Sequence, residues 1–462
     1  MNQEHKLGAV TWAKRGSFIL AATGSSVGLG NIWKFPYIAG QNGGGAFVLM
    51  YIGMVLLVGI PILLAELVLG RRGRASPINT MRALSRETHS SRFWTIIGWM
   101  GALCGLMILS FYSVAAGWVL AYFDHALRGD FRGLDGSGSL TLFANLLANR
   151  DLLLLLHTVF ILMTVVVLAL GVKKGLESAI RWMMPSLFAL VIVLLVAATI
   201  EGEFAQSLRY MFSFKLSDIT WESALIAMGH SFFTLSVGMG AIIAYGAYTP
   251  RDMSVGRTVL TVAFLDTCVA LGVGVAIFAF VFATPGISPS QGPGLMFVTL
   301  PVAFGGLPAG DVIASIFFGM VILAAWTSTI SLLEPSIAYL TETFKMHRAA
   351  SSALLGFVAW LLGVGAALSF NDWAHVEILW GKTFFDTMDF VASNILLPLG
   401  GLLIALFVGW RMSAQQLNQE VDLAGSRIMR IWRLLLRYLS PLAILIIFVY
   451  SILPVLQAVF GE

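Results

Sequence analysis

Two short glycine-rich stretches, each inside an apolar segment, carry the residues best suited to hold a small ligand. Ser26-Val27-Gly28-Leu29-Gly30 lies near the N-terminus, and Ser236-Val237-Gly238-Met239-Gly240 repeats the pattern in the second half. Paired glycines are poor helix formers, so each stretch is predicted to interrupt a helix. In hydrocarbon an unpaired peptide group costs several kcal/mol, so such a break persists only where it is buried or lines a cavity. A matched pair of breaks is typical of a transporter's central site; the alternative is two glycine-rich helix-packing patches.

The chemistry at the first break suits a cation together with a zwitterion. Carbonyl groups before the break suit a hard cation, and the N–H groups that begin the next half-helix suit a carboxylate. Asn31 adds a side-chain oxygen, but residues 24–31 contain no acid. An amine without its own carboxylate would need an acid here, and Gly28 offers none. The sequence therefore favours an amino acid, which carries both charges itself.

Further polar residues lie within other apolar segments. Thr327 and Ser328 are adjacent hydroxyls that predict a second cation site against the first break; the alternative is that both bond back to their own helix. Asp266 lies deep in a segment, and charges inside spans are expensive and usually functional. Lys34, one turn beyond the first break, is predicted to form a latch with Asp389 above the site; the alternative is that Lys34 extends to the interface alone.

The elements that position these residues are predicted to be membrane helices. The 462-residue chain is 58% hydrophobic and 11% charged, whereas soluble domains carry about 25% charge. The composition indicates one all-α polytopic membrane domain over 1–462, in contact with the bilayer, and its net charge of +4 indicates basic inner loops rather than a nucleic-acid partner. Since a span needs about 20 apolar residues, we expect eleven: 17–40, 46–70, 93–123, 152–171, 178–200, 221–248, 257–284, 312–341, 350–369, 383–410 and 432–459.

The distribution of basic residues predicts the orientation. With the N-terminus in the cytoplasm, 21 lysines and arginines fall in inner segments and 6 in outer ones, so we expect that orientation, with the C-terminus outside. The broken segments are helices 1 and 6, so 17–200 and 221–410 are predicted to form a 5+5 inverted repeat. Helix 11 at 432–459 lies outside it. The apolar loop 284–311 is expected to dip into an outer vestibule or to pack on helix ends.

Four separated motifs resemble those of the neurotransmitter:sodium symporter family, in its bacterial LeuT-like amino-acid branch. They are GSSVGLGNIWKFPYIAGQNGGGAF at 24–47, SFFTLSVGMGAIIAYGAY at 231–248, WTSTISLLEP at 326–335 and DTMDF at 386–390. The resemblance runs from about Trp12 to the end of helix 11. It implies the LeuT-like fold with broken helices 1 and 6.

The resemblance also implies roles for individual residues. A first sodium site would use the Ser26 carbonyl, Asn31, Thr234 and Asp266 with the substrate carboxylate. A second would use the carbonyls of Gly24, Val27 and Ala324 with the side chains of Thr327 and Ser328. Substrate would contact Ser26, Gly28, Leu29, Gly30, Ile108, Tyr112, Phe233, Thr234, Ser236, Met239, Ser328 and Leu332, with Tyr112 and Phe233 as an aromatic lid. Lys34 and Asp389 would form the outer gate, Trp12, Tyr248 and Glu342 parts of the inner gate, and Gly175 with Pro185 an unwinding point in helix 5.

This sequence departs from the family pattern at several positions. The outer-gate cation is Lys34 where many bacterial relatives have arginine, and Ala9 stands where an inner-gate arginine is expected. Asp266 replaces an asparagine, and Ala270 replaces the serine of chloride-requiring members. Because Asp266, with Tyr51 and His230 nearby, can supply the negative charge that chloride supplies elsewhere, we expect chloride-independent transport.

Residues and resemblance together imply a sodium-coupled symporter and no enzymatic activity. We expect it to import hydrophobic amino acids, aliphatic and aromatic, with two Na⁺ ions by alternating access across a bacterial cytoplasmic (inner) membrane, with the monomer as the functional unit. Three alternatives remain open at this point: a cation channel lined by the same carbonyls, an intramembrane enzyme that uses His230 and Asp266, and a receptor that binds amino acids without moving them.

Overall fold

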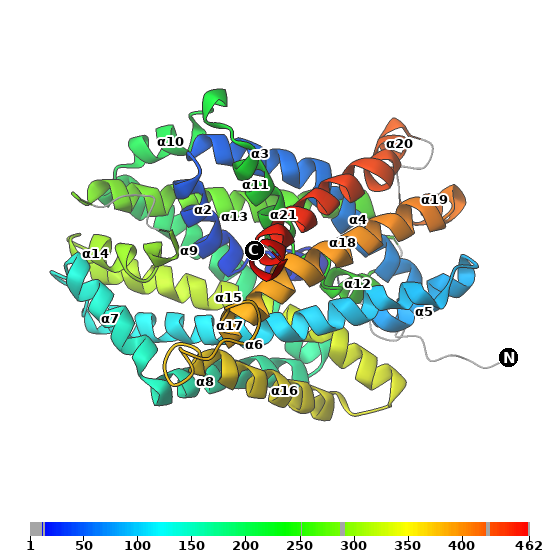
Figure 1. Cartoon of the computed structure of the whole chain (residues 1–462), viewed down its shortest axis with the longest axis horizontal. Helices are drawn as coiled ribbons and strands as arrows, with labels where there is room; N and C mark the ends of the chain where they lie inside the picture. The colour runs from blue at the N-terminus through cyan, green and yellow to red at the C-terminus, as the bar shows by residue number, and fades with distance from the viewer. Residues whose placement is uncertain (1–11, 13, 251, 287–291, 422–425, 461–462) are drawn as a thin grey trace.

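The structure, a computed structural model, describes residues 12, 14–250, 252–286, 292–421 and 426–460. Across these ranges the chain is almost entirely helical, and the β-pairing found there is one isolated bridge between Leu379 and Lys382. Most long helices run along the horizontal axis of Figure 1. The short helices α7 and α14 lie at one end of this bundle, and α5 and α19 lie at the opposite end.

Nine helices within the described ranges are long and apolar enough to cross a membrane. Several of them combine α-helical and π-helical parts. Their bounds are Gly45–Gly73 (α3, η3, α4), Arg92–Arg128 (η4, α6), Arg150–Ala169 (α8), Val172–Glu201 (η5, α9), Val255–Ala283 (α13), Gly310–Thr343 (α15), Arg348–Leu368 (α16), Phe384–Arg411 (α17, η8, α18, η9) and Arg427–Leu453 (α20, η10 and part of α21, which ends at Phe460).

Two further segments are interrupted in the middle, and they complete the eleven predicted spans. The first consists of α1 (Arg15–Ser26), η2 (Gly30–Lys34) and α2 (Phe35–Gln41). The second consists of α11 (Trp221–Thr234) and α12 (Ala241–Ala247). The break at Val27–Leu29 and the break at Leu235–Gly240 are buried. The two stretches that sequence predicts to interrupt their helices therefore do so.

Short helices connect the spans, and the sequence reading did not anticipate them. They are α5 (Pro77–Glu87), α7 (Gly136–Ala148), α10 (Phe204–Phe212), η6 (Leu216–Asp218), η7 (Gly292–Leu295), α14 (Thr299–Gly305) and α19 (Ala414–Glu420). Two of these helices nevertheless begin with common N-terminal capping residues. Asp135 caps α7 by accepting a hydrogen bond from the Gly138 N–H, and Ser413 with Gln416 forms a capping box that begins α19.

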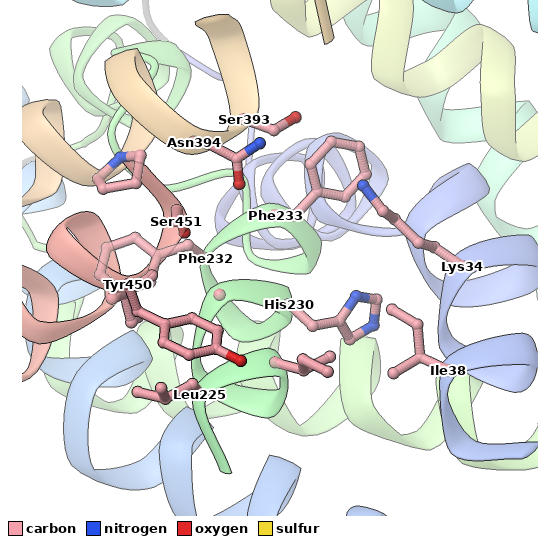
Figure 2. Close-up of a pocket in the computed structure, with 14 residues that line it drawn as sticks. Lys34, Ile38, Leu225, His230, Phe232, Phe233, Ser393, Asn394, Tyr450 and Ser451 are labelled. Atoms are coloured by element: carbon pink, nitrogen blue, oxygen red, sulfur yellow. The ribbon is translucent and has the colours of Figure 1, made fainter. Parts of the chain in front are cut away.

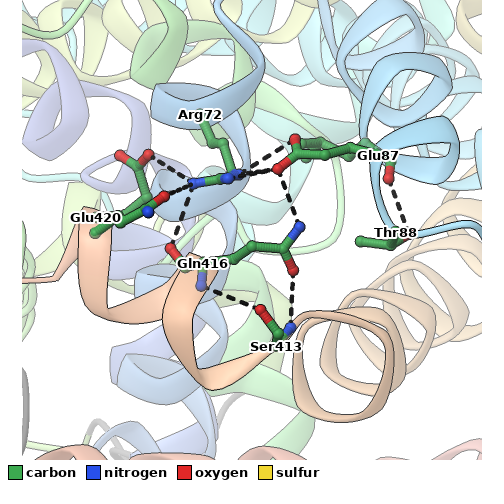
Figure 3. A network of polar contacts seen from close by, with 8 residues as sticks. Arg72, Glu87, Thr88, Ser413, Gln416 and Glu420 are labelled. Atoms are coloured by element: carbon green, nitrogen blue, oxygen red, sulfur yellow. Dashed lines mark hydrogen bonds and ion pairs between the residues drawn. The ribbon is translucent and has the colours of Figure 1, made fainter.

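A polar network joins the ends of α4, α5 and α19 (Figure 3). Arg72 donates hydrogen bonds to both Glu87 and Glu420, and the Gln416 amide donates to the same Glu87 carboxylate over 3.0 Å. The hydrogen bond from Arg72 lowers the pKa of Glu87 below its ordinary value. The network holds the connection between the last two spans against the end of α4.

Candidate functional site

The first break leaves peptide groups that side chains partly satisfy. Val27 leaves the helical conformation with ψ near 110°, while its N–H still donates to the Thr23 carbonyl. The Gly28 N–H donates to Asn31 Oδ1 over 3.2 Å, and the Leu29 N–H donates to the Tyr112 hydroxyl over 2.9 Å. Side chains from the same segment and from α6 thus replace the helix bonds that the break removes.

The second break has a backbone that requires glycine. Gly238 has φ of +91°, and a Cβ added there would lie 2.5 Å from the Leu397 carbonyl oxygen. The Gly238 N–H donates to Oε1 of Glu66, a carboxylate buried on α4. Glu66 is thus a partner of the second break that the sequence analysis did not name. The Ser236 hydroxyl donates to the Ser25 carbonyl over 2.7 Å, which ties the two breaks together.

A small cavity of about 30 Å³ lies between the two breaks. It is lined by ten of the twelve predicted substrate residues and by Ser25, which the sequence reading missed. The lining residues are Ser25, Ser26, Gly28, Gly30, Ile108, Tyr112, Phe233, Ser236, Met239, Ser328 and Leu332. The other two predicted residues lie beside it: Leu29 lines the space above, and Thr234 belongs to the first cation cluster described below.

A larger cavity of about 360 Å³ lies beyond the small one and includes Leu29, Lys34 and Asp389 in its walls. Tyr112 and Phe233 line both cavities, so they form the partition between them. Gly294, from the apolar loop 284–311, also lines the larger cavity, as one of the two readings of that loop predicted. We call this larger cavity the vestibule.

Three of the carbonyls predicted for the second sodium site lie near the Ser328 hydroxyl. Ser328 Oγ lies 3.1 Å from the Val27 carbonyl, 3.1 Å from the Ala324 carbonyl and 3.5 Å from the Gly24 carbonyl. Thr327 Oγ1 lies 3.0 Å from the same Ala324 carbonyl. Ser328 therefore contacts both the first break and its own helix, whereas, among the described residues, the Thr327 hydroxyl bonds only to carbonyls of its own helix, Leu323 and Ala324. Oxygens of these types suit a hard monovalent cation.

Three of the four residues predicted for the first sodium site form a second cluster. Asn31 Nδ2 donates to Asp266 Oδ1 over 2.8 Å, and the Tyr51 hydroxyl lies 3.3 Å from Thr234 Oγ1 and 3.5 Å from Asp266 Oδ2. Asp266 is fully buried, and a buried carboxylate needs hydrogen bonds or a cation to offset its desolvation. For Ser26 the predicted ligand is the main-chain carbonyl, which stays a prediction; its side chain donates to the Ala22 carbonyl and, over 3.4 Å, to the Leu235 carbonyl of the second break.

The predicted latch between Lys34 and Asp389 is not joined in this structure. Lys34 Nζ lies 4.5 Å from the centre of the Phe233 ring, and Asp389 accepts a hydrogen bond from Ser393. Both residues line the vestibule. The Lys34 ammonium group and the Asp389 carboxylate, both among the described residues, form no ion pair within 4.0 Å. The reason is that the flexible lysine stem reaches the aromatic partition, where a cation–π contact holds the ammonium group.

The opposite side of the site is closed by a buried cluster. The Trp12 indole donates to the Tyr245 carbonyl, and the Trp12 N–H donates to the Tyr248 carbonyl. The Tyr248 hydroxyl donates to Glu334, which also pairs with Arg348. Sequence reasoning named Trp12 and Tyr248 but missed the role of Glu334 and Arg348.

Glu342, which was predicted to belong to the same gate, contacts the start of α5 rather than the Trp12, Tyr248 and Glu334 cluster. Its carboxylate accepts hydrogen bonds from the Ser76 N–H and from the Asn79 side chain. It therefore anchors the start of α5. Ala9, which stands where an inner-gate arginine is expected, lies outside the described residues. Gly175 lies in the π-helical turn Val172–Glu177, and Pro185 lies inside α9, so the predicted unwinding point is wound here.

We expect Arg348→Met to destabilise the folded protein strongly. Glu334 is fully buried and the Arg348 side chain is 17% exposed, so the change leaves a carboxylate without its cation. Removing one partner of a buried pair costs about 3–5 kcal/mol. Thermal unfolding of the purified protein measures the loss.

Two variants control this experiment. Arg128→Met breaks an exposed pair with Asp124 and should cost less than about 1 kcal/mol. The double variant Glu334→Leu/Arg348→Met removes both charges and should recover most of the stability. A single variant as stable as the wild type would show that the pair contributes nothing.

Comparison with known proteins places this arrangement in a family. Residues 10–132 and 148–461 match the profile of the Sodium:neurotransmitter symporter family. The chain belongs to this family. Its members are transporters and not enzymes, so the intramembrane-enzyme alternative is wrong, and this symporter is a multi-pass membrane protein.

Individual relatives agree with that assignment. An uncharacterized sodium-dependent transporter, YhdH of Bacillus subtilis, is 37% identical over 95% of this chain and 97% of its own length. The sodium-dependent dopamine transporter of Bos taurus is 25% identical over 96% of this chain and 69% of its own length. The crystal structure of MhsT in complex with L-phenylalanine matches with a TM-score of 0.87 and 41% identity, over 96% of this chain and 99% of that one. The predicted LeuT-like fold class is confirmed.

Proposed function

We propose that this symporter imports hydrophobic amino acids, aliphatic and aromatic, together with two Na⁺ ions. The observation that carries the proposal is the cavity between the two breaks, which has Ser26, Gly28 and Gly30 of the first break on its wall together with Ile108, Met239 and Leu332. A zwitterion would place its charged end on the breaks and its side chain among these apolar residues. The likeness to MhsT, which was crystallised with L-phenylalanine, supports an amino-acid substrate.

Crowding at Gly28 supports a substrate that brings its own carboxylate. A Cβ at Gly28 would lie 2.5 Å from Ser328 Oγ and 2.8 Å from the Tyr112 hydroxyl. The chain therefore has no room for an acidic side chain there. The Tyr112 hydroxyl and the peptide groups around it would bind the substrate carboxylate, which completes the first sodium site. Because the substrate carboxylate would be a ligand of the sodium ion, binding of the amino acid and binding of sodium would depend on each other.

Alternating access follows from the two unequal sides of the cavity. On the vestibule side, Tyr112 and Phe233 lie between the cavity and a space of about 360 Å³. On the other side the Trp12, Tyr248 and Glu334 cluster closes the path. Rotation of the lid would admit substrate from the vestibule, and opening of the cluster would release it. The basic-residue distribution supports a cytoplasmic N-terminus, which would place release inside a bacterial cytoplasmic membrane and the C-terminus outside.

The membrane potential would suffice to drive accumulation. A potential of about 100 mV contributes ~2.3 kcal/mol per charge. Two sodium ions then contribute ~4.6 kcal/mol, which corresponds to roughly a thousandfold concentration ratio. A single chain contains both breaks and both cation clusters, which supports the monomer as the functional unit.

Asp266 supports transport without chloride. Its carboxylate lies within the first cation cluster and has Tyr51 and Asn31 as neighbours. A fixed negative charge at this position would balance the sodium charge that a mobile anion balances elsewhere.

Sodium-dependent binding tests the proposal directly. We expect purified protein to bind labelled L-phenylalanine at least about a hundredfold more tightly in sodium than in potassium, because the carboxylate and the ion share a site; this factor is ~2.8 kcal/mol. Equal affinities would contradict the coupling. Flux into proteoliposomes then separates the remaining alternatives: a receptor gives binding without flux, and a channel gives sodium current without saturable amino-acid uptake.

A further inference from the structure

A stripe of arginines lies on the first part of the last span. This part consists of α20 (Arg427–Leu434) and η10 (Leu435–Leu439). Its arginines recur at intervals of three or four residues, which places them along one side of the helix. We call this set the arginine stripe, and its members are Arg427, Arg430, Arg433 and Arg437.

Aromatic and backbone contacts hold one end of the stripe against the preceding span. Arg437 Nε donates to the Gly409 carbonyl over 2.7 Å, and the Arg437 guanidinium carbon lies 5.5 Å from the centre of the Trp410 ring. The Trp410 indole N–H in turn donates to the Arg437 carbonyl over 3.2 Å. Arg411, the next residue, adds a fifth guanidinium group, 6.0 Å from the centre of the Trp94 ring. The junction of the last two spans therefore carries five arginines.

The arginine stripe has no acidic partner among the described residues. None of the ion pairs within 4.0 Å between described residues includes any of its four members. Glu420, which precedes the stripe in the chain, is paired with Arg71 and Arg72 instead, and Asp422 lies outside the described residues. Arg433 Nε is covered by protein and forms no hydrogen bond with a described residue. The stripe therefore favours an anionic partner from outside the chain.

An apolar surface beside the stripe narrows the choice of anion. Ile428, Ile431, Leu434 and Tyr438 lie on the same helix, and each side chain is more than half exposed. In a chain that spans a bilayer, exposed apolar side chains of this kind face lipid acyl chains. A free inorganic anion would gain nothing from this surface, whereas a phospholipid carries a phosphate and acyl chains in one molecule.

The position of the stripe along its helix indicates which leaflet it faces. Figure 2 shows Tyr450 and Ser451, farther along the same helix, in a pocket that also contains Lys34 of the predicted outer gate. Arg437 precedes Tyr450 by 13 residues, which is about 20 Å of helix. Figure 1 shows α20 toward the end of the bundle that carries α5 and α19. With the N-terminus in the cytoplasm, as proposed above, this end faces the cytoplasmic leaflet, which has a negative surface potential.

We propose that the arginine stripe binds the phosphate of an anionic phospholipid in the cytoplasmic leaflet. The outer guanidinium nitrogens of Arg430 and Arg433 would donate paired hydrogen bonds to the phosphate oxygens. One acyl chain would lie along Ile431 and Leu434. The bound headgroup offsets the mutual repulsion of the arginines and holds α20 at the membrane surface. This site concerns the lipid around the symporter and is separate from the proposed transport function.

Substitutions in the middle of the stripe separate charge from geometry. Arg430→Gln/Arg433→Gln removes two charges and keeps side chains that form hydrogen bonds, whereas Arg430→Lys/Arg433→Lys keeps both charges but loses the paired geometry. Arg430→Gln alone changes only an exposed side chain, so the fold is not at risk. The matched control is Arg82→Gln/Arg86→Gln, which removes two charges one turn apart on α5, at the same end of the bundle.

The test measures lipid binding to the full-length protein in uncharged detergent micelles by native mass spectrometry. We expect the wild type to bind dioleoyl-phosphatidylglycerol at least about tenfold more tightly than dioleoyl-phosphatidylcholine, which has the same acyl chains but no net charge. Arg430→Gln alone should weaken binding of phosphatidylglycerol roughly fivefold. The double glutamine variant should weaken it roughly thirtyfold, or ~2 kcal/mol for two basic residues near a membrane surface. The lysine variant should lose less than the double glutamine variant, and the α5 control should match the wild type.

Three results would overturn the proposed site. The first is equal affinity of the wild type for the two lipids. The second is unchanged affinity for phosphatidylglycerol in Arg430→Gln and in the double glutamine variant, with folding verified by circular dichroism. The third is displacement of the lipid by an equal concentration of inorganic phosphate, which would show a site for a free anion. Because the measurement needs neither sodium nor transport, failure here is distinguishable from failure of the proposed transport function.

Discussion

Gly28→Asp will abolish binding and uptake of amino acids. The new side chain would begin 2.5 Å from Ser328 Oγ and 2.8 Å from the Tyr112 hydroxyl, so both groups must move. Its carboxylate would also repel the carboxylate of the substrate within a buried site. A buried charge without a partner costs about 3–5 kcal/mol, which is a loss of affinity of roughly a hundredfold or more. Uptake of labelled leucine and phenylalanine into proteoliposomes measures the effect.

A second glycine on the same segment serves as the control. A Cβ at Gly16 would meet nothing within 4 Å, so Gly16→Asp adds the same charge at the exposed start of α1. This variant should keep uptake near the wild-type rate. The placement of the substrate on the first break would be wrong if Gly28→Asp, folded and inserted normally, still transported leucine or phenylalanine.

Asp266→Asn will weaken sodium binding by the largest factor of any conservative change in the cation clusters. Asp266 is fully buried and lies 2.8 Å from the Asn31 amide. Removing a full charge near a bound ion costs about 2–4 kcal/mol at a protein-like dielectric, or roughly 30- to 1,000-fold in apparent sodium affinity. The sodium dependence of phenylalanine binding gives this factor.

The same preparation tests the role of chloride. Replacing chloride by gluconate should leave wild-type uptake within about twofold if, as proposed, the Asp266 carboxylate supplies the negative charge that balances sodium. Asp124→Asn, at the exposed end of α6, should leave both sodium and chloride behaviour unchanged. Wild-type uptake that stops without chloride would refute the role assigned to Asp266.

Local sequence was sufficient to predict the breaks, whereas most of the side chains around them were named from the resemblance to the family. Paired glycines within apolar segments specify where a membrane helix ends, and the two breaks, at Val27–Leu29 and Leu235–Gly240, lie where the glycines indicated. Within hydrocarbon, side-chain hydroxyls and amides near a break have few hydrogen-bond partners other than the peptide groups that the break exposes. This explains why the Ser328 hydroxyl lies against the first break, at the Val27 carbonyl.

Contacts that depend on packing between distant helices were not predictable in the same way. In the sequence, nothing distinguishes Glu66 from the other acidic residues within spans. Its role becomes clear only from the structure, where it accepts a hydrogen bond from the Gly238 N–H. The Glu334 and Arg348 pair required knowledge of how α15 and α16 meet. The Lys34 side chain has two attractive partners, Asp389 and the Phe233 ring, and spacing along the chain does not decide between them.

The central cavity, at about 30 Å³, is close to the volume that one or two water molecules need. Any amino acid that enters must push the walls of the cavity apart. Each methylene added to its side chain gains about 0.8 kcal/mol from burial, but it also increases the free energy needed to widen the cavity. These opposing terms would make affinity pass through a maximum along a homologous series of guests. Substrate selectivity in this symporter would then depend on how easily the side chains of Met239, Ile108 and Leu332 rearrange, more than on a preformed pocket shape.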